Sequence, residues 1–272
     1  MNLKPTYERP IIHDRWEAVY RSNPLQDQLN ATLMDRVLAC VKPEPGALFL
    51  DAGCGVGYHS LAIARRGFRV VGVDISSNVL RQADDNLQRC GYGDRVHFRC
   101  ESLENLPFAD GHFDVVHCRG VLMHVPQWEA ALAQLCRVLK PGGKIVLMES
   151  NSTAVETQLV RLLRHVRQNR SLMVQTPGGI EFWAEEDGHP VVTRIAHVPY
   201  LLGQLERWGV RPIKRFATEF FDINRFAPGL RRDLVIRFNH LWFALRLPSA
   251  LSIGNGIIGR KAGALPGRIA AG

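Results

Sequence analysis

The chain has 272 residues, which is long enough to bury a full hydrophobic core and fits one domain with additions. Apolar residues make up 46% and charged residues 22%, as in ordinary globular proteins, and no apolar stretch approaches the roughly 20 residues of a membrane-spanning helix. The start lacks a signal-peptide pattern, and the six cysteines are scattered without a C-x-x-C pair. We therefore expect a cytoplasmic protein with free thiols, without a disulfide framework or a metal site.

The net charge of +8 is unevenly distributed. Residues 1–150 hold 17 basic and 17 acidic side chains, whereas residues 151–272 hold 17 basic and 9 acidic ones. A basic C-terminal half is typical of proteins that meet nucleic acid, an anionic membrane surface or an acidic substrate. A solvated basic face without a ligand explains the same excess equally well.

The first 150 residues predict a helical extension followed by an α/β unit. Residues 1–45 are expected to be the extension, because apolar residues at helical spacing precede a Pro-Glu-Pro-Gly turn. Strands are expected at 47–51, 69–73, 95–100, 113–118 and 144–149, and helices near 57–66, 77–90 and 127–139. This alternation over 46–150 predicts a doubly wound, mostly parallel sheet that binds ligands at the carboxyl ends of its strands.

After residue 150 the pattern changes. Residues 153–173 predict one amphipathic helix, and residues 174–193 are rich in turn formers. We expect 151–197 to form a mobile lid over a substrate site, and 198–272 to complete the sheet. The elements expected there are helices near 198–208 and 231–246 and strands near 212–221 and 253–261. In the second of these helices one face carries Leu234, Phe238, Leu241, Trp242 and Leu245.

The most informative motif lies at residues 48–57, which read Leu-Phe-Leu-Asp-Ala-Gly-Cys-Gly-Val-Gly. A strand ends in Asp51, and a second apolar run at 70–73 ends in Asp74, near the usual spacing of ~20 residues for a carboxylate that receives ribose hydroxyls. A dinucleotide fold needs G-x-G-x-x-G, but Tyr58 holds the position of its third glycine. Asp51 would also repel a pyrophosphate, so the turn favours a cationic ligand.

The D-x-G-x-G-x-G form resembles motif I of the class I S-adenosylmethionine-dependent methyltransferases, whose cofactor carries a sulfonium and an α-ammonium and no phosphate. Three later segments are also similar to that family. They are the run Phe113-Asp114-Val115-Val116, the segment 121–125, which is like one in ubiquinone-pathway and natural-product enzymes, and the Leu-Lys-Pro-Gly-Gly turn at 139–143. The resemblance covers about residues 46–149. It implies a Rossmann-like domain of an enzyme that uses S-adenosylmethionine.

The resemblance also implies which residues contact the cofactor. Asp51 is expected near the ammonium, Asp74 at the ribose, and the loop around Ser102 at the adenine, although the family often has Asp at this last position. The position just past the fourth strand faces the methyl group in this family. The full expected set is Asp51, Gly53, Gly55, Gly57, Asp74, Ile75, Ser102, Leu103, Cys118 and Arg119.

His124 is the candidate general base, because an imidazole with a pKa near 6.5 accepts a proton at neutral pH. The alternative is that it caps a helix or packs beside the cofactor. In this family the acceptor meets the methyl group under N-terminal segments and an insert after the fifth strand, here 1–45 and 151–197. The aromatic and imidazole groups available there are Trp16, Tyr20, Trp183, His189 and His197.

Three functions remain open from the sequence. The first is methyl transfer to oxygen or carbon of a quinone, lipid or secondary metabolite, with peripheral membrane contact through the Arg161–Arg170 flank and residues 231–246 if the acceptor is a lipid. The second is an RNA methyltransferase, but the chain shows no RNA-binding motif, so nucleic acid is not the expected partner. The third is a non-catalytic cofactor-binding module. A homodimer is compatible with each.

Overall fold

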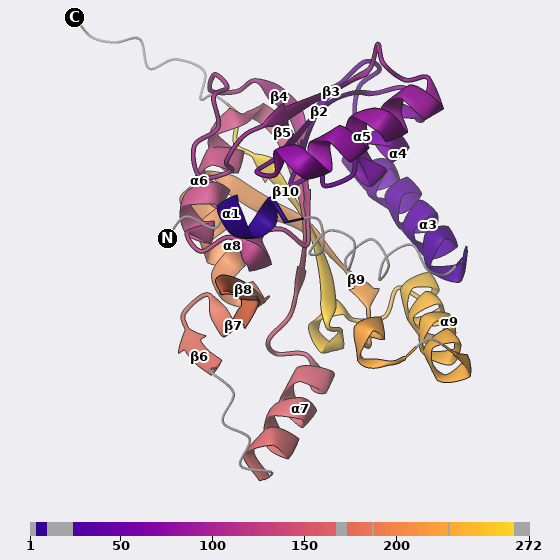
Figure 1. The fold of residues 1–272 in the computed structure, drawn as a ribbon, viewed down its shortest axis with the longest axis vertical. Helices are drawn as coiled ribbons and strands as arrows, with labels where there is room; N and C mark the ends of the chain where they lie inside the picture. The colour runs from indigo at the N-terminus through magenta and orange to yellow at the C-terminus, as the bar shows by residue number, and fades with distance from the viewer. Residues whose placement is uncertain (1–3, 10–23, 167–172, 187, 228, 264–272) are drawn as a thin grey trace, which may run out of the picture.

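The computed structural model describes residues 4–9, 24–166, 173–186, 188–227 and 229–263. Its main sheet has seven strands in the order β3-β2-β1-β4-β5-β10-β9 (Figure 1). The strands are β1 (Leu48–Ala52), β2 (Arg69–Asp74), β3 (Val96–Cys100), β4 (Phe113–Arg119), β5 (Leu139–Ser150), β9 (Val210–Glu219) and β10 (Gly254–Lys261). The first five pair in parallel, and β10 is antiparallel to both of its neighbours. The expected doubly wound, mostly parallel sheet is confirmed.

Helices cover both faces of this sheet (Figure 1). They are α3 (Pro24–Val41), α4 (Tyr58–Ala64), α5 (Ser77–Cys90), α6 (Trp128–Val138), α8 (Val198–Arg207) and α9 (Leu230–Ala244). Successive side chains of a strand point to opposite faces, so Phe49 joins a core with α3 and α4, whereas Leu50 joins a second core with α6 and α8. No helix of the described residues is long and apolar enough to cross a membrane.

The Lys-Pro-Gly-Gly run at 140–143, expected to be a turn, belongs to the start of β5. The pairing with β4 shifts register between Phe113 and Val115, which marks an irregular strand rather than a separate turn. Gly142 has a φ of 79°, and a Cβ on Gly143 would come within 2.9 Å of the carbonyl oxygen of Asp114. The two glycines therefore allow the chain to enter the sheet at once after α6.

The insert consists of helix α7 (Val155–Val166) and a three-stranded antiparallel sheet. Its strands are β6 (Met173–Thr176), β7 (Gly179–Glu186) and β8 (His189–Ala196). The expected helix at 153–173 begins at Val155 and is described as far as Val166, whereas residues 167–172 lie outside the described residues and Met173 belongs to β6. The expected turn-rich segment is mostly strand. The turn formers at 177–178 and 188 mark only the hairpin turns, while β-branched and aromatic residues fill the strands between them.

The short helix α1 (Lys4–Tyr7) joins three parts of the molecule. The carboxylate of Glu8 accepts hydrogen bonds from the backbone amides of Ser77 and Asn78 at the start of α5. Partial burial opposes ionisation of this carboxyl, but these bonds hold the pKa of Glu8 below its ordinary value. The Tyr7 hydroxyl donates to the backbone carbonyl of His124, 3.0 Å away. The N-terminal segment is thus tied to the carboxyl edge of the sheet.

Candidate active site

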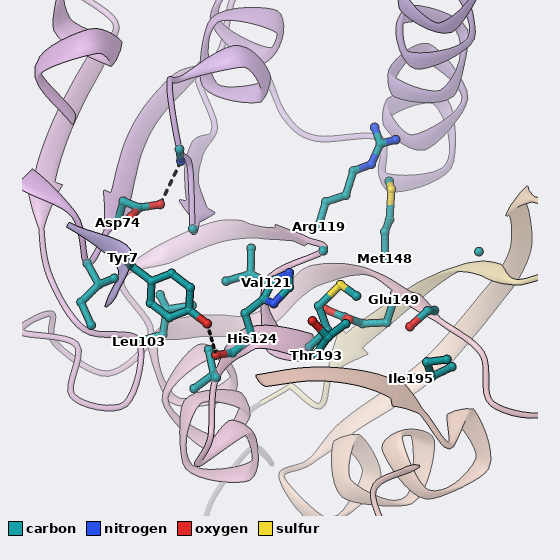
Figure 2. Close-up of a pocket in the computed structure, with 18 of the residues that line it drawn as sticks. Tyr7, Asp74, Leu103, Arg119, Val121, His124, Met148, Glu149, Thr193 and Ile195 are labelled. Atoms are coloured by element: carbon teal, nitrogen blue, oxygen red, sulfur yellow. Dashed lines mark hydrogen bonds between the residues drawn. The ribbon is translucent and has the colours of Figure 1, made fainter. Parts of the chain in front are cut away.

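A cavity of about 1040 Å³ lies at the carboxyl ends of the parallel strands (Figure 2). We divide its wall into two parts. The glycine-loop half comprises residues 53–56, 74–75, 79 and 100–104, which follow β1, β2 and β3. The insert half comprises Asn30 and those residues that line the cavity within the ranges 119–126, 148–150, 157–161, 173–195 and 218–225. Asp74, His124 and Glu149 therefore face one continuous space.

The glycine loop keeps its backbone uncovered where it borders the cavity. Gly53 and Gly55 have φ values of 70° and 53°, in the left-handed region that favours glycine. A Cβ on Gly53 would collide with the side chain of Val121, whereas a Cβ on Gly55 would meet only open space. Gly57, with a φ of 80°, lies outside the wall, where a Cβ would meet the ring of Phe98. A ligand can therefore lie directly against the backbone at Gly55.

Asp74 ends β2 and lies on the wall beside the loop (Figure 2). One carboxylate oxygen accepts a hydrogen bond from the Gly55 amide and the other from the Ser76 amide, each at a distance of 3.0 Å. A carboxylate oxygen has two lone pairs, so one hydrogen bond from a backbone amide does not by itself prevent it from accepting another. This arrangement is suited to a vicinal diol such as a ribose, and Ile75 follows on the same wall.

The loop after β3 covers the far side of the glycine-loop half. Ser102 and Leu103 both line it, as expected, and the Ser102 hydroxyl accepts from the Glu104 amide at 3.2 Å. The charges on this half are the carboxylates of Asp74, Glu101 and Glu104, and the ammonium of Lys4 also lines the cavity. The excess of acids suits a cationic ligand and not a polyphosphate.

Like Gly57, the expected cofactor residues Asp51 and Cys118 do not line the cavity. Asp51 is only 2% exposed, and its oxygens lie 2.9 Å from His117 Nδ1 and 2.6 Å from Ser60 Oγ. It therefore links β1, β4 and α4 under the loop, and its side chain does not reach an ammonium in the cavity. Cys118 is fully buried in the core because side chains alternate along β4, and burial raises the pKa of its thiol well above the ordinary value.

Arg119, the next residue on β4, faces the cavity. Its guanidinium donates a hydrogen bond to the Asn30 side-chain oxygen over 2.8 Å. Asn30 belongs to α3, so the N-terminal extension contributes to the wall, as does Tyr7 of α1. This location of the extension agrees with the segment expected to meet the acceptor.

His124 ends a short 3-10 helix, η1 (Leu122–His124), and lines the cavity (Figure 2). Its Nδ1 lies 2.9 Å from the carbonyl oxygen of Val192 on β8. A carbonyl can only accept, so Nδ1 carries the proton and Nε2 is the basic nitrogen. Burial lowers the pKa of His124, the Val192 bond opposes this, and the charge of Arg194 lowers it further. The ring is therefore neutral at physiological pH.

Two glutamates of the insert half were not among the expected residues. Glu149, at the end of β5, accepts from the Leu122 amide over 3.1 Å, while its Oε2 has no hydrogen-bond partner among the described residues. Burial raises the pKa of Glu149 to about 7. Glu219, at the end of β9, also lines the cavity, and burial raises its pKa to about 7 against the opposing charge of Arg119. Both groups titrate near neutral pH.

A buried arginine fixes the insert to η1. Arg194 of β8 is 3% exposed and forms an ion pair with Glu181 of β7 at 2.8 Å. The same guanidinium donates to the carbonyl oxygens of Leu122 and Val125, at 2.9 and 3.1 Å. The strands of the insert are therefore held against the segment that carries His124.

The aromatic candidates for acceptor binding lie elsewhere. Trp183 packs in a small cluster with Tyr7 and Val192, His189 begins β8, and His197 precedes α8, all outside the cavity wall. Trp16 and Tyr20 lie outside the described residues. The three-stranded sheet of the insert contributes apolar and hydroxyl side chains to the wall, one of them an aromatic ring. They are Met173, Ile180, Phe182, Thr193 and Ile195.

Comparisons with known proteins agree with the fold and the glycine-loop half. Residues 50–147 match the family model described as a methyltransferase domain. The chain is 36% identical over 139 residues to a ubiquinone biosynthesis O-methyltransferase from Xanthomonas axonopodis pv. citri, covering 51% of this chain and 56% of that protein. It is 35% identical over 105 residues to methyltransferase GfsG from Streptomyces halstedii, covering 38% of each. The chain thus spans about half or less of the length of these relatives.

Two solved structures share the fold. Magnesium protoporphyrin IX methyltransferase (ChlM) from Synechocystis PCC 6803, with bound SAH, superposes with a TM-score of 0.62 at 17% identity, covering 94% of this chain and 97% of that chain. The [4+2]-cyclase SpnF superposes with a TM-score of 0.59 at 20% identity, covering 86% and 81%. At these identities the likeness establishes the fold alone.

Residues 50–147 match a methyltransferase domain, and the main sheet has the fold of the superposed methyltransferase structure. The rest of the chain adds to this domain the helices α1, α3, α8 and α9, the insert, and the strands β9 and β10.

Proposed function

We propose that this chain binds S-adenosylmethionine in the glycine-loop half and transfers its methyl group to oxygen or carbon of a small organic acceptor in the insert half. The observation that carries the proposal is the single cavity that joins Asp74 to His124 and Glu149. The residues fit the cofactor, because the uncovered backbone at Gly55 and the carboxylate of Asp74 suit its tail and its ribose. Leu103 offers an apolar surface to the adenine.

The cofactor, when bound, supplies a methyl group on a sulfonium, which is already electrophilic. The protein then has to hold the acceptor in line with the carbon–sulfur bond and exclude water. The apolar side chains of Met148, Ile180 and Ile195 provide walls for such an acceptor, and Thr193 provides a hydroxyl for its orientation. Arg194 and Tyr7 hold the enclosing segments in place.

His124 is the group proposed to remove the acceptor's proton. Its neutral ring, with the proton fixed on Nδ1 by Val192, presents Nε2 as the base. Glu149 is the second candidate, since its Oε2 lies in the same buried region and its pKa is near 7. Either group serves a phenol, hydroxyl or acidic carbon.

The alternative functions have less support. The insert half combines aliphatic walls with buried carboxylates, which suits a compact organic molecule better than the stacking platforms that bind single-stranded RNA. The likeness to a [4+2]-cyclase shows that this fold also serves other chemistry, so a reaction without methyl transfer is the second candidate.

The decisive experiment follows tritium from methyl-labelled S-adenosylmethionine into extract fractions. We expect label in a small-molecule fraction. Label in RNA would replace the proposed acceptor class. Tight cofactor binding by calorimetry with no transfer to any fraction would favour the cyclase-like or non-catalytic alternative.

A further inference from the structure

Helix α9 is oriented with its most apolar face outward. Its buried residues are Arg232, Ile236, Asn239 and Phe243, so a charged and a polar side chain lie on the inner face. Large apolar residues instead occupy an exposed row, with 39% to 75% of each side chain accessible: Leu230, Leu234, Phe238, Leu241 and Leu245. Their spacing of three or four residues places them on one face of the helix. We call this set the α9 row.

The outward orientation is fixed by specific contacts. The Asn239 side chain accepts hydrogen bonds from the backbone amides of Phe220 and Phe221 and donates to the carbonyl oxygen of Phe221. One turn further along α9, the guanidinium of Arg36 from α3 lies over the Phe243 ring, 3.7 Å from its centroid. Rotation of α9 to bury the leucines would break these contacts.

Helix α7 has the same property. Its exposed apolar residues, which we call the α7 row, are Val155, Leu159, Leu162 and Leu163. The helix projects from the end of the molecule at which α9 also lies (Figure 1). Glu156, in its first turn, forms an ion pair with Arg225 at 2.6 Å and accepts from the Asp222 amide at 2.8 Å. Arg225 and Asp222 immediately precede α9, so the two rows are held at the same end.

Helix α7 and the segment before α9 border the insert half of the cavity. Thr157, Val160 and Arg161 of α7 line it, as do Asp222 and Arg225. Met173 of β6 both lines the cavity and is exposed, so the wall reaches the surface beside α7. An apolar molecule bound along the rows therefore has a direct path to the acceptor site.

The charge beside the rows is positive. Arg231, Arg237 and Arg246 are exposed on or just after α9, and Arg161 stands beside the α7 row. The whole net charge excess of the chain lies in residues 151–272. Apolar faces flanked by arginines are typical of helices that lie in the interface of an anionic bilayer. A contact between two copies of this chain would bring these arginines together and would be opposed by their repulsion.

We infer that the α7 and α9 rows dock the protein on an anionic lipid bilayer. Their leucines enter the region between head groups and acyl chains, and the arginines contact the lipid phosphates. On the basis of the proposed function, the inference also defines the acceptor as an amphiphile. Its apolar tail remains on the lipid side while its polar head reaches His124 and Glu149.

The test is co-sedimentation of the full chain with vesicles. We expect binding to phosphatidylcholine vesicles that contain phosphatidylglycerol, weaker binding to phosphatidylcholine alone, and a decline with added salt. Leu162→Glu in the α7 row and Leu241→Glu in the α9 row should each lower the partition coefficient about tenfold or more. Each removes an apolar side chain that the bilayer would bury and adds a negative charge.

Trp208→Glu is the matched control. Trp208 is 46% exposed and lies beside the start of β9, which pairs with Lys261 at the end of the sheet opposite the cavity. It should bind vesicles like the unchanged protein. Circular dichroism and the melting temperature establish that each variant is folded.

Several outcomes would overturn the inference. One is that the unchanged protein fails to bind either vesicle type. Another is that Trp208→Glu and Leu241→Glu lose binding equally. Sedimentation that shows a dimer broken by Leu162→Glu, without vesicle binding, would assign the rows to a second copy instead. The binding assay needs neither cofactor nor turnover, so its failure is distinguishable from failure of the proposed methyl transfer.

Discussion

The two halves of the cavity are assembled in different ways. The glycine-loop half uses residues between 53 and 104, each just after one of three neighbouring parallel strands, and backbone amides already satisfy its key acid, Asp74. The insert half draws residues from between 30 and 225, on elements far apart in the sequence, and its acids Glu149 and Glu219 are buried with pKa values near 7. The glycine-loop half is preorganised to bind one ligand, whereas the protonation of the acids in the insert half changes near neutral pH.

The largest effect is expected at the junction of the halves. His124→Ala should reduce turnover by ~10²–10⁴-fold while cofactor affinity stays nearly unchanged, because a general base acts only on the acceptor. Steady-state kinetics over pH, together with calorimetry on the cofactor product, measure both quantities. If the variant keeps more than about a tenth of the activity, His124 is a packing residue, and Glu149→Gln becomes the test of the base.

A stability effect should distinguish the acids of the insert half from those of the glycine-loop half. The pKa of Glu149 in the folded protein is about 7, above the ordinary value of 4.5. The contribution of the protonated group to stability is therefore fully present below pH 4.5 and is lost as the pH rises through 7. Glu149→Gln should therefore increase stability relative to the unchanged protein by up to about 3 kcal/mol at pH 8, and by little at pH 4.

Urea unfolding at both pH values measures this difference. Asp110→Asn is the control, because Asp110 is an exposed carboxylate paired with Arg137 at the surface. It should change stability by less than about 1 kcal/mol at either pH. Equal effects of Glu149→Gln at pH 4 and pH 8 would contradict a titrating Glu149.

Within the glycine-loop half, Asp74→Ala should weaken cofactor binding by about 1.5–3 kcal/mol, the scale of hydrogen bonds to a charged acceptor. Calorimetry with S-adenosylmethionine measures the loss, and NAD should not bind to either protein. The side chain ends a strand at the cavity edge, so folding should be retained. Unchanged affinity in the folded variant would place Asp74 outside the cofactor site.

The smallest expected effect is a change in hydrogen exchange within the insert. We predict that protection of residues 151–197 rises when the cofactor product and the acceptor are both bound, since lids commonly gate such transfers. The rise should be larger in α7, whose apolar row is exposed, than in β8, which Arg194 already fixes. Uniformly high protection in the free protein would contradict a lid.

The sequence predicted the glycine-loop half better than the insert half. The helix expected at 77–90 has the same bounds as α5, and Asp74 lies at the cavity, because both depend on local periodicity and on a motif after one strand. Glu149 follows a parallel strand in the same manner as Asp74, so the same reasoning could have found it. Glu219 required the knowledge that β9 runs parallel to β5 across the antiparallel β10.

Other features depend on tertiary structure. The periodicity of 231–246 placed its apolar residues on one face, but only the contacts of Asn239 and Phe243 show that this face is turned outward. The burial of Cys118 beside the cavity-facing Arg119 depends on a one-residue phase along β4. The sheet β6-β7-β8 was missed because glycines and prolines stand in its turns and at the ends of its strands.

The clamp formed by Arg194 has a consequence for protein engineering. Its guanidinium connects the insert to η1 through main-chain carbonyls, which any sequence at 122–126 supplies, and through Glu181 within the insert itself. The side chains that attach the insert to η1 therefore belong to the insert itself. Chimeras that exchange residues 151–197 between related chains should keep the insert in the same position when both Arg194 and Glu181 are transferred with it. Acceptor specificity could then be exchanged without redesign of η1.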